Sequence, residues 1–451
     1  MILSRLHQTD GATALASRAV EVMREILPIC RSITGNGVRA TLDILGREAP
    51  LERVEVASGT PVFDWEVPRE WNVREAYVVG PDGQRVVDVR RHSLHLLNYS
   101  VPVRATMSLA ELRPHLYSLP DHPDWIPYRT SYWREHWGFC LPHRQLAMLP
   151  EGQYEVVIDS SLEPGSLTYA ECRIPGELPD EFLVSTHVCH PGLANDNASG
   201  MAIAALLASE LGRARPRLSY RVLFTPVTIG SMTWLMRNES AARALRGGLV
   251  IGLLGGPGSL TYKRSRRGNT EVDHIAAAAV RDLDPAARVV EFSPYGYDER
   301  QYCSPGFDLA VGRLTRAPHG EYAEYHTSAD DLDLIDVGAL AQSIQAVARI
   351  LARVDGNHRL RSRVPNGEPR LGKRGLFRST GGTNPQDFEY ALLWILNQAD
   401  GTHGLNDIGA ASGLTDDVLR QAGEALLDAK LIDDIDRRSP RGGDATGPSA
   451  P

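Results

Sequence analysis

The sequence is poor in cysteine, and its few cysteines form neither a disulfide pattern nor a metal-binding pattern. The 451 residues include five cysteines, which are spread along the chain without a CxxC pair. Scattered cysteines in an odd number argue against a disulfide framework and against a structural zinc knuckle. We therefore expect a protein held together by its hydrophobic core, and its length suffices for two or three domains.

The chain also lacks a long hydrophobic run and a strong excess of either charge. The longest uncharged stretch, 247–262, is rich in glycine and too short to cross a bilayer. Residues 1–30 carry charges among the apolar positions, so we expect no signal peptide and a cytoplasmic location. The 48 Lys and Arg residues face 56 Asp and Glu residues, a net charge of −8. This mild acidity predicts no global attraction to nucleic acid or membrane.

What the sequence does contain is an alternation of strand-like and helix-like patterns in its central part. The strand-like runs are 182–188, 220–227, 248–254 and 308–314, and the helix-like runs are 198–214, 273–283 and 336–354. Strands that are apolar along their whole length, separated by helices, are typical of a parallel sheet covered on both faces. We predict an α/β fold with a mostly parallel mixed sheet flanked by helices.

The regions around this alternation have different patterns. Roughly 55–160 is rich in β-formers and turn signals, which predicts a β-rich region with an aromatic stretch at 124–143. Residues 357–384 are basic and without periodicity, as in a linker. Residues 385–436 contain three short helical patterns with a glycine turn, which is typical of a winged helix. The composition of 437–451 predicts a disordered tail.

The densest group of metal-binding residue types lies between the first predicted strand and helix of the alternation. His187, His190 and Asp196 follow strand 182–188 and precede helix 198–214. Ligands bind beyond the carboxyl ends of the strands in such sheets, and imidazole plus carboxylate is a usual donor set for zinc. In a purely structural interpretation, Asp196 caps the helix and His187 packs in the core. Two histidines and an aspartate on one loop favour the metal site.

A second loop carries His326 between aromatic residues, followed by Ser328, Asp330 and Asp331. The serine and aspartates are compatible with a simple helix-capping arrangement. A catalytic zinc, however, needs three protein ligands and usually recruits them from distant loops. Because the first loop already offers two histidines and an aspartate, His326 is a candidate for the third ligand.

Two further loops contain candidate substrate-binding groups. Asp298, Glu299, Arg300 and Tyr302 lie in a segment rich in glycine and proline, which is common active-site material but also occurs in solvated surface loops. Arg266 and Arg267 follow a predicted strand and offer donors for a carboxylate or phosphate. A solvated basic turn is the alternative interpretation of this pair.

These segments resemble bacterial aminopeptidase-like proteins of the co-catalytic zinc aminopeptidase superfamily, which are often found beside genes of polysaccharide or natural-product biosynthesis. The stretches that carry the resemblance are 29–42, 62–78, 98–103, 185–202, 265–269, 294–308, 324–336 and 367–376. The resemblance covers nearly the whole chain. It implies an α/β domain of 1–58 and 150–356, an inserted β-rich domain at 59–149, a linker at 357–384, a winged-helix domain at 385–436 and a tail at 437–451.

The resemblance also implies metal ligands, of which three match. His187, Asp196 and His326 correspond to the first histidine, the bridging aspartate and the last histidine of the superfamily. The other positions depart from its pattern: Cys189 replaces an aspartate, 225–235 lacks the pair of glutamates, and Gly255 and Gly256 replace a ligand aspartate. One zinc ion with a water in the open position remains chemically adequate.

The resemblance then predicts a metal-dependent hydrolase for an amide bond of a small peptide or aminoacyl metabolite. Glu299 is the favoured general base and Glu324 the second choice; His190, Arg266, Arg267, Asp298 and Tyr302 are expected to bind substrate. Two alternatives stay open. One is a degenerate binding or scaffold protein, and the other is a biosynthetic enzyme that forms or rearranges an amide in the same pocket.

The winged-helix pattern itself suggests DNA binding, but its charge does not. Residues 385–436 contain eleven Asp and Glu residues against Arg420 and Lys430. DNA binding depends on clustered Lys and Arg that neutralise phosphates. We therefore expect this module to mediate protein contacts, including self-association into a homo-oligomer, rather than to bind nucleic acid.

Overall fold

The computed structural model describes residues 2–318, 320–376 and 385–436. The chain divides into two compact units, residues 1–350 and residues 351–451. Among the described residues, no helix has the length and apolar character needed to cross a membrane.

The first unit is built on an eight-stranded mixed sheet with the order β1-β10-β12-β11-β13-β16-β14-β15. Its strands are β1 (Glu52–Ala57), β10 (Ser166–Ile174), β12 (Ser219–Thr225), β11 (Glu181–His187), β13 (Leu245–Ile251), β16 (Val311–Thr315), β14 (Thr261–Lys263) and β15 (Arg288–Val290). The four central strands from β12 to β16 are parallel, whereas β10 and β14 pair antiparallel with their inner neighbours. The predicted α/β fold with a mixed sheet is confirmed.

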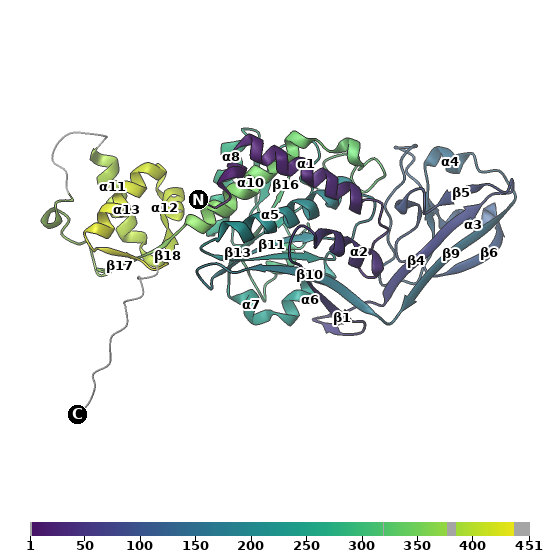
Figure 1. The fold of residues 1–451 in the computed structure, drawn as a ribbon, viewed down its shortest axis with the longest axis horizontal. Helices are drawn as coiled ribbons and strands as arrows, with labels where there is room; N and C mark the ends of the chain where they lie inside the picture. Colours follow the sequence, from purple (N-terminus) through teal and green to yellow (C-terminus); the bar gives the residue numbers. More distant parts are fainter. Residues whose placement is uncertain (1, 319, 377–384, 437–451) are drawn as a thin grey trace, which may run out of the picture. The chain divides into compact units, whose positions relative to one another are not determined.

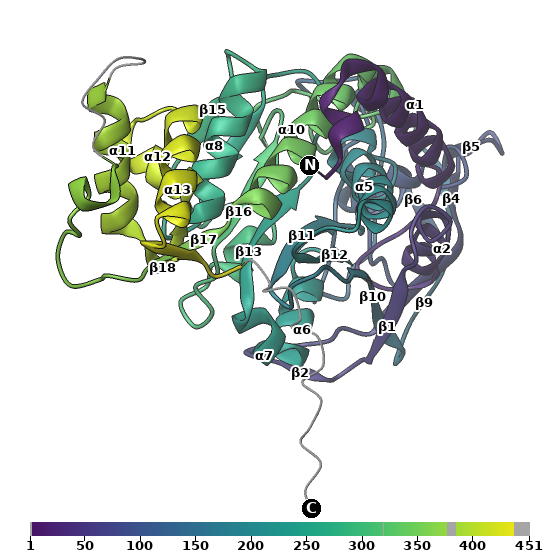
Figure 2. The same ribbon diagram turned by 60° about the vertical axis from the view of Figure 1, so that its left-hand side comes forward.

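Helices cover both faces of this sheet (Figures 1 and 2). They are α1 (Thr9–Ile26), α2 (Asn36–Leu45), α5 (Gly200–Ala214), α6 (Ile229–Arg237), α7 (Glu239–Arg243), α8 (Glu271–Leu283), the short α9 (Glu299–Tyr302) and α10 (Val337–Gly356). Helix α5 is apolar on nearly all sides because it packs between the sheet and α1. Helices α1, α5 and α10 lie on one face, and α6 and α7 lie on the other.

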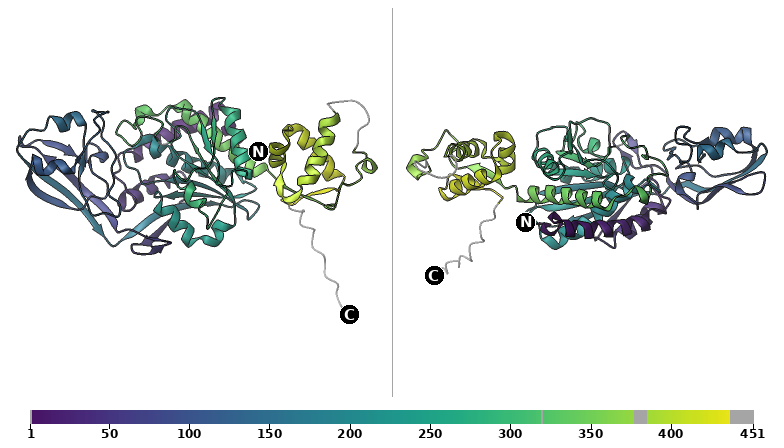
Figure 3. Two further views of the ribbon diagram at one scale, coloured as in Figure 1. Left: turned by 180° about the vertical axis from the view of Figure 1, so that it is seen from behind. Right: turned by 90° about the horizontal axis from the view of Figure 1, so that it is seen from above.

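A smaller antiparallel sheet of order β5-β4-β9-β6 lies beside the main one in the first unit (Figure 3). Its strands are β4 (Glu70–Val79), β5 (Arg85–Asp88), β6 (Val103–Ser108) and β9 (Gln153–Glu163). Short elements accompany it: β2 (Pro61–Val62), β3 (Trp65–Glu66), β7 (Leu116–Tyr117), β8 (Phe139–Cys140), α3 (Leu109–Leu112) and α4 (His143–Ala147). Strand β9 leads almost directly into β10, so the two sheets share a continuous stretch of chain.

The second unit contains a three-stranded sheet of order β18-β17-β19 with three helices. The elements are β17 (Arg359–Ser362), α11 (Pro385–Gln398), β18 (Asp400–Gly404), α12 (Leu405–Ser412), α13 (Asp416–Asp428) and β19 (Ile432–Asp434). Strand β17 lies inside the stretch that the sequence predicts as a basic linker, and Arg359 there pairs with Asp436 at 2.6 Å. Part of that stretch is therefore the central strand of the module. The predicted tail at 437–451 lies outside the described residues.

Candidate metal centre and active-site pocket

The metal-binding residue types meet where strand β11 ends. This strand is buried along most of its length and ends at His187. Asn197 fixes the strand end, because its amide nitrogen donates to the His187 carbonyl (2.9 Å) and the Thr186 hydroxyl (2.8 Å). The irregular turn Ala194–Ser199 leads into α5 and places Asp196 beside the strand end.

Asp196 lies between two histidines from distant segments. Its Oδ1 is 2.9 Å from Nε2 of His187, and its Oδ2 is 3.0 Å from Nε2 of His326. His190 joins them, since one donor atom each of His187, His190 and Asp196 lie within 4.8 Å of one another. We call His187, His190, Asp196 and His326 the histidine cluster. The structure thus brings the three predicted ligands together with His190, which the loop pattern grouped with them and which the resemblance implied as a substrate-binding residue.

Two atoms of the histidine cluster lack a hydrogen-bond partner among the described residues. They are Oδ2 of Asp196 and Nε2 of His326, which are buried and face each other without the alignment of a hydrogen bond. Buried polar atoms are normally satisfied, and a carboxylate oxygen next to an imidazole nitrogen is a donor set for a divalent cation. These residues therefore fit the zinc ion that the fold family implies.

The electrostatics of the histidine cluster keep Asp196 and His190 in metal-binding form. Burial by itself would raise the pKa of Asp196, but His190, His187 and His326 together hold that pKa well below its ordinary value. Burial also lowers the pKa of His190 far below its ordinary value, so its imidazole is neutral. An ionised carboxylate and neutral imidazoles are the forms that bind metal.

A buried carboxylate supports the loop that carries Asp196. Asp330 accepts hydrogen bonds from the backbone N–H groups of Asn195 (2.5 Å) and Asp196 (3.0 Å). Its burial raises the pKa of Asp330 to about 7. The side chain of Asn195 in turn accepts from the N–H groups of Gly255 (3.0 Å) and Gly256 (2.9 Å). Asn195 thus fills the space beside the two glycines that replace the superfamily's ligand aspartate.

Tyrosine rings surround the histidine cluster. The ring of Tyr297 stacks on His187 with centroids 4.9 Å apart, and Tyr325 stacks on His326 at 3.9 Å. Tyr128 contacts His326 edge to face at 5.1 Å, and its backbone N–H donates to the His326 carbonyl at 2.8 Å. Tyr128 comes from the predicted insertion, so that region contributes directly to the site. Sequence reasoning missed this role, although the aromatic stretch at 124–143 was the available signal.

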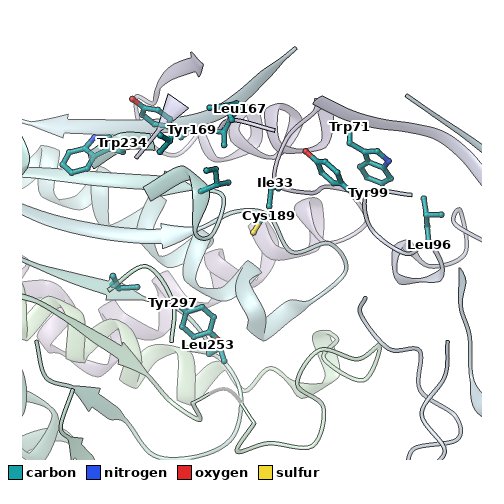
Figure 4. Close-up of a cluster of buried hydrophobic side chains, with 14 of the residues drawn as sticks. Ile33, Trp71, Leu96, Tyr99, Leu167, Tyr169, Cys189, Trp234, Leu253 and Tyr297 are labelled. Atoms are coloured by element: carbon teal, nitrogen blue, oxygen red, sulfur yellow. The ribbon is translucent and has the colours of Figure 1, made fainter. Parts of the chain in front are cut away.

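Cys189 belongs to the hydrophobic core beside the histidine cluster (Figure 4). It is fully buried in one apolar cluster with Ile33, Leu253 and Tyr297. Its Sγ lies 3.2 Å from Nδ1 of His190, and burial raises the pKa of the thiol to about 12. The position at which the resemblance would place a carboxylate is therefore occupied by a neutral thiol.

An open pocket of about 280 Å³ adjoins the histidine cluster at His190. Its aromatic lining comes from Trp65, Tyr132, Trp133, Tyr297 and Tyr325. The wall next to α6 consists of Val227, Thr228, Ile229 and Met232, in the segment where the superfamily carries its pair of glutamates. Arg300, on α9, also lines the pocket. The pocket is thus largely aromatic and aliphatic, and none of its lining residues bears a carboxylate.

Three residues of the loop at 293–308 are buried away from the pocket lining. Glu299 is fully buried and pairs with Lys263 at 2.9 Å and with Arg313 at 3.2 Å. Asp298 accepts from the Ser231 hydroxyl at 2.7 Å, and burial raises its pKa to about 6. The hydroxyl of Tyr302 lies 2.9 Å from that of Ser185 inside the protein. None of these three residues lies in the pocket wall, whereas Arg300 of the same loop does.

The remaining predicted residues lie nearer the surface. Arg266 and Arg267 both pair with Asp308 at 3.1 Å, and each side chain is about half exposed. Glu324 is partly exposed and lies two residues before His326. Glu324 is therefore close in sequence to a member of the histidine cluster. The two arginines, in contrast, already have a counter-ion in Asp308.

Comparisons with known proteins place the chain among aminopeptidase-like proteins. A family model described as a domain of unknown function (DUF4910) matches residues 20–357, and a winged helix-turn-helix model matches residues 358–434. A Clostridium acetobutylicum protein is 45% identical over 91% of this chain and 95% of its own length. Its name assigns it provisionally to polysaccharide biosynthesis and gives it an aminopeptidase-like domain.

Two solved structures are similar in fold. A Clostridium acetobutylicum crystal structure, described provisionally as a peptidase, has a TM-score of 0.82 at 42% identity and covers 94% of this chain and 98% of its own. A zinc aminopeptidase of Bacillus subtilis has a TM-score of 0.55 at 11% identity over 75% of this chain and 94% of its own. The chain therefore belongs to the DUF4910 family of proteins with an aminopeptidase-like fold, and it carries a C-terminal winged helix.

Proposed function

We propose that the chain is a metal-dependent hydrolase that cleaves an amide bond of a small peptide or aminoacyl compound at the histidine cluster. The observation that carries this proposal is the convergence of three imidazoles and one carboxylate, from two distant loops, beside an open pocket. The aminopeptidase-like fold of the family supports the same reaction class.

The histidine cluster suits one divalent ion of the zinc type. His187, Asp196 and His326 are its proposed ligands, with His190 as a further donor. A second group of ligand residues does not occur in the described part of the chain. When bound, such an ion supplies Lewis acidity to a carbonyl group and lowers the pKa of a bound water.

One tyrosine is suited to bind the oxygen of the scissile carbonyl. Tyr297 and Tyr325 both line the pocket, and the Tyr297 hydroxyl donates to the Tyr325 hydroxyl at 3.5 Å. Burial raises the pKa of both phenols, so they remain protonated at neutral pH, and we assign the hydrogen bond to the carbonyl oxygen to Tyr325. Donors that are already fixed in place stabilise the negative charge that develops on the carbonyl oxygen.

The attack of water also needs a proton acceptor. Glu299 is an unsuitable base, because Lys263 and Arg313 neutralise it in the protein interior. We assign the role to Glu324, which forms no ion pair within the described residues and lies next to the histidine cluster along the chain. Glu324→Gln is expected to lower kcat with little change in KM, whereas Glu321→Gln, which removes a surface partner of Arg288, is the matched control.

Metal analysis together with a hydrolysis assay tests the proposal. The full-length chain is expected to bind about one equivalent of zinc and to hydrolyse dipeptides in a chelator-sensitive way. His187→Ala and His326→Ala should each remove the metal and the activity, whereas His122→Ala, at a histidine outside the histidine cluster, should retain both. Metal content unchanged by both cluster variants would refute the metal role.

A second candidate is an enzyme that forms or rearranges an amide in the same pocket. It is favoured by the pocket wall at Val227, Thr228, Ile229 and Met232, which lacks the acids used for hydrolysis in the superfamily. The biosynthetic name of the Clostridium acetobutylicum relative points the same way. Mass spectrometry of products formed from an aminoacyl ester and an amine distinguishes the two reactions, since only the second candidate yields a new amide.

A further inference from the structure

Arg300 is a cation without a counter-ion in the wall of the pocket. It lies on α9, is partly exposed, and its Nε is buried without a hydrogen-bond partner in the described residues. No described carboxylate lies within ion-pair distance of its guanidinium, in contrast to Arg266 and Arg267, which share Asp308. The planar fork of N–H donors on a guanidinium matches a carboxylate in shape as well as in charge.

The surroundings of Arg300 strengthen its attraction for an anion. The other pocket residues are aromatic, aliphatic or neutral, among them Trp65, Trp133, Ile229 and Met232. An apolar wall screens charge less than water does, so an opposite charge entering the pocket interacts strongly with the guanidinium. The same wall offers no carboxylate to a free α-ammonium group. The charge pattern therefore favours a substrate that brings an anion to the pocket.

We infer that the substrate carries a free carboxylate, which Arg300 binds, next to an apolar or aromatic group that packs against Trp65 and Trp133. This inference rests on the proposed function, because the pocket adjoins the histidine cluster at which the amide would be cleaved. A phosphate ester fits less well, since its charge of nearly two would be only half compensated by one guanidinium. The pocket volume of about 280 Å³ suits one amino-acid side chain with its carboxylate. The favoured substrates are N-acyl amino acids and dipeptides recognised at their carboxyl end.

Calorimetric titration with three ligands of similar shape tests the inference. The ligands are phenylacetate, phenylacetamide and phenethylamine, which carry charges of −1, 0 and +1. The full-length protein is titrated as purified and again after dialysis against a chelator, because a bound metal would itself attract phenylacetate. We expect phenylacetate to bind best in both preparations and phenethylamine to bind worst.

Arg300→Gln separates the role of the guanidinium from that of the pocket shape. It should weaken phenylacetate binding roughly tenfold to a hundredfold, as expected for a charged hydrogen bond, and leave phenylacetamide binding within about twofold. Arg300→Lys should retain part of the preference. Arg144→Gln, which removes a surface arginine paired with Asp124, is the control for charge and should change neither. Thermal melting verifies folding, and loss of an unpaired cation should not lower the melting temperature.

Two results would overturn the inference. One is equal affinity of the wild type for phenylacetate and phenylacetamide, and the other is an equal loss of affinity for both ligands in Arg300→Gln. Hydrolysis distinguishes this failure from a failure of the proposed function. N-acetylphenylalanine and its amide are compared as substrates, and the wild type is expected to prefer the free acid. A preference for phenylacetate without any turnover would contradict hydrolysis and support the carboxylate site. Turnover without a preference for the free acid would support hydrolysis and contradict the carboxylate site.

Discussion

At the scale of single residues, the donors of the histidine cluster depend on neighbours that do not bind metal themselves. Asp330 holds the backbone of Asn195 and Asp196, and Asn197 holds the end of β11. Residues that orient metal ligands typically affect affinity about as much as some ligands do. The site is therefore larger than its four donors.

Asp330→Asn tests this support. Asp330 now accepts hydrogen bonds from two backbone N–H groups. The amide of asparagine would place its own N–H donors against one of them, so the Asp196 loop should shift. We expect zinc affinity to fall by roughly 10–100-fold in a competition assay with a fluorescent chelator. Asp331→Asn is the matched control, because the Asp331 side chain only caps the Asp333 N–H at the surface. Equal affinities in Asp330→Asn and the wild type would contradict the role.

Asp298 gives a pH dependence of stability with a defined sign. Burial raises its pKa from 3.8 to about 6, so the folded state binds a proton more tightly than the unfolded state. Its contribution is therefore most favourable below about pH 4 and is lost as the pH rises toward 6. The melting temperature of the wild type should fall between these values relative to that of Asp298→Asn. Parallel pH profiles for the two proteins would refute this assignment.

At the scale of elements, the glycines after β13 explain why the described residues do not form a second set of ligands. A Cβ on Gly256 would lie 2.7 Å from Nδ2 of Asn195, and one on Gly255 would lie 3.0 Å from Cδ1 of Ile335. A carboxylate there would displace Asn195 or enter an apolar contact. The packing around this turn therefore accommodates glycine, and not aspartate, at the two positions where the resemblance implies a ligand.

Gly256→Asp is therefore expected not to restore a second metal. It should destabilise the fold by about 1–3 kcal/mol in urea unfolding because of overpacking, and metal content should not rise. Gly306→Asp is the control, since a Cβ at Gly306 meets open space. A second equivalent of zinc in a stable Gly256→Asp protein would show that the space is available.

The hairpin of β2 and β3 supplies one wall of the pocket through Trp65, which meets Trp133 edge to face at 5.1 Å. Trp65→Ala should raise KM several-fold with a small change in kcat, because the contact contributes to binding of substrate and transition state alike. Phe63→Ala is the matched control on the same hairpin, since Phe63 packs on Phe307 outside the pocket lining. A change confined to kcat would argue against this binding role.

The sequence predicted those parts of the site that are local to strand ends. His187 and Asp196 share one strand-to-helix loop, so their proximity follows from chain connectivity. His326 was predicted as a third ligand from the ligand number of a catalytic zinc and from the resemblance, whereas Tyr128, Trp65 and Trp133 reach the site through long-range packing that no local pattern encodes. Glu299 looked accessible in its Gly/Pro-rich loop because the sequence does not show that Lys263 and Arg313 enclose it.

At the scale of the whole molecule, the acidic charge resides in residues 385–436, with eleven Asp and Glu residues against two cations. Two arginines of the basic segment before them are already engaged, because Arg359 pairs with Asp436 and Arg363 with Asp433. We expect no shift of duplex DNA in a gel assay with the full-length chain at about 150 mM salt, since helices α11, α12 and α13 offer a single cation, Arg420, to replace condensed counterions. Salt-sensitive binding at submicromolar protein would contradict this expectation.

The bridge between Pro127 and Thr327 joins the β-rich region to the loop of His326. The β-rich region is therefore not an interchangeable attachment, because one of its backbone segments helps to set the position of a proposed metal ligand. A shift of the backbone at 126–128 would therefore also move the backbone at 326–328. A chimera that exchanges this region between relatives would have to carry both sides of the bridge as one inherited unit.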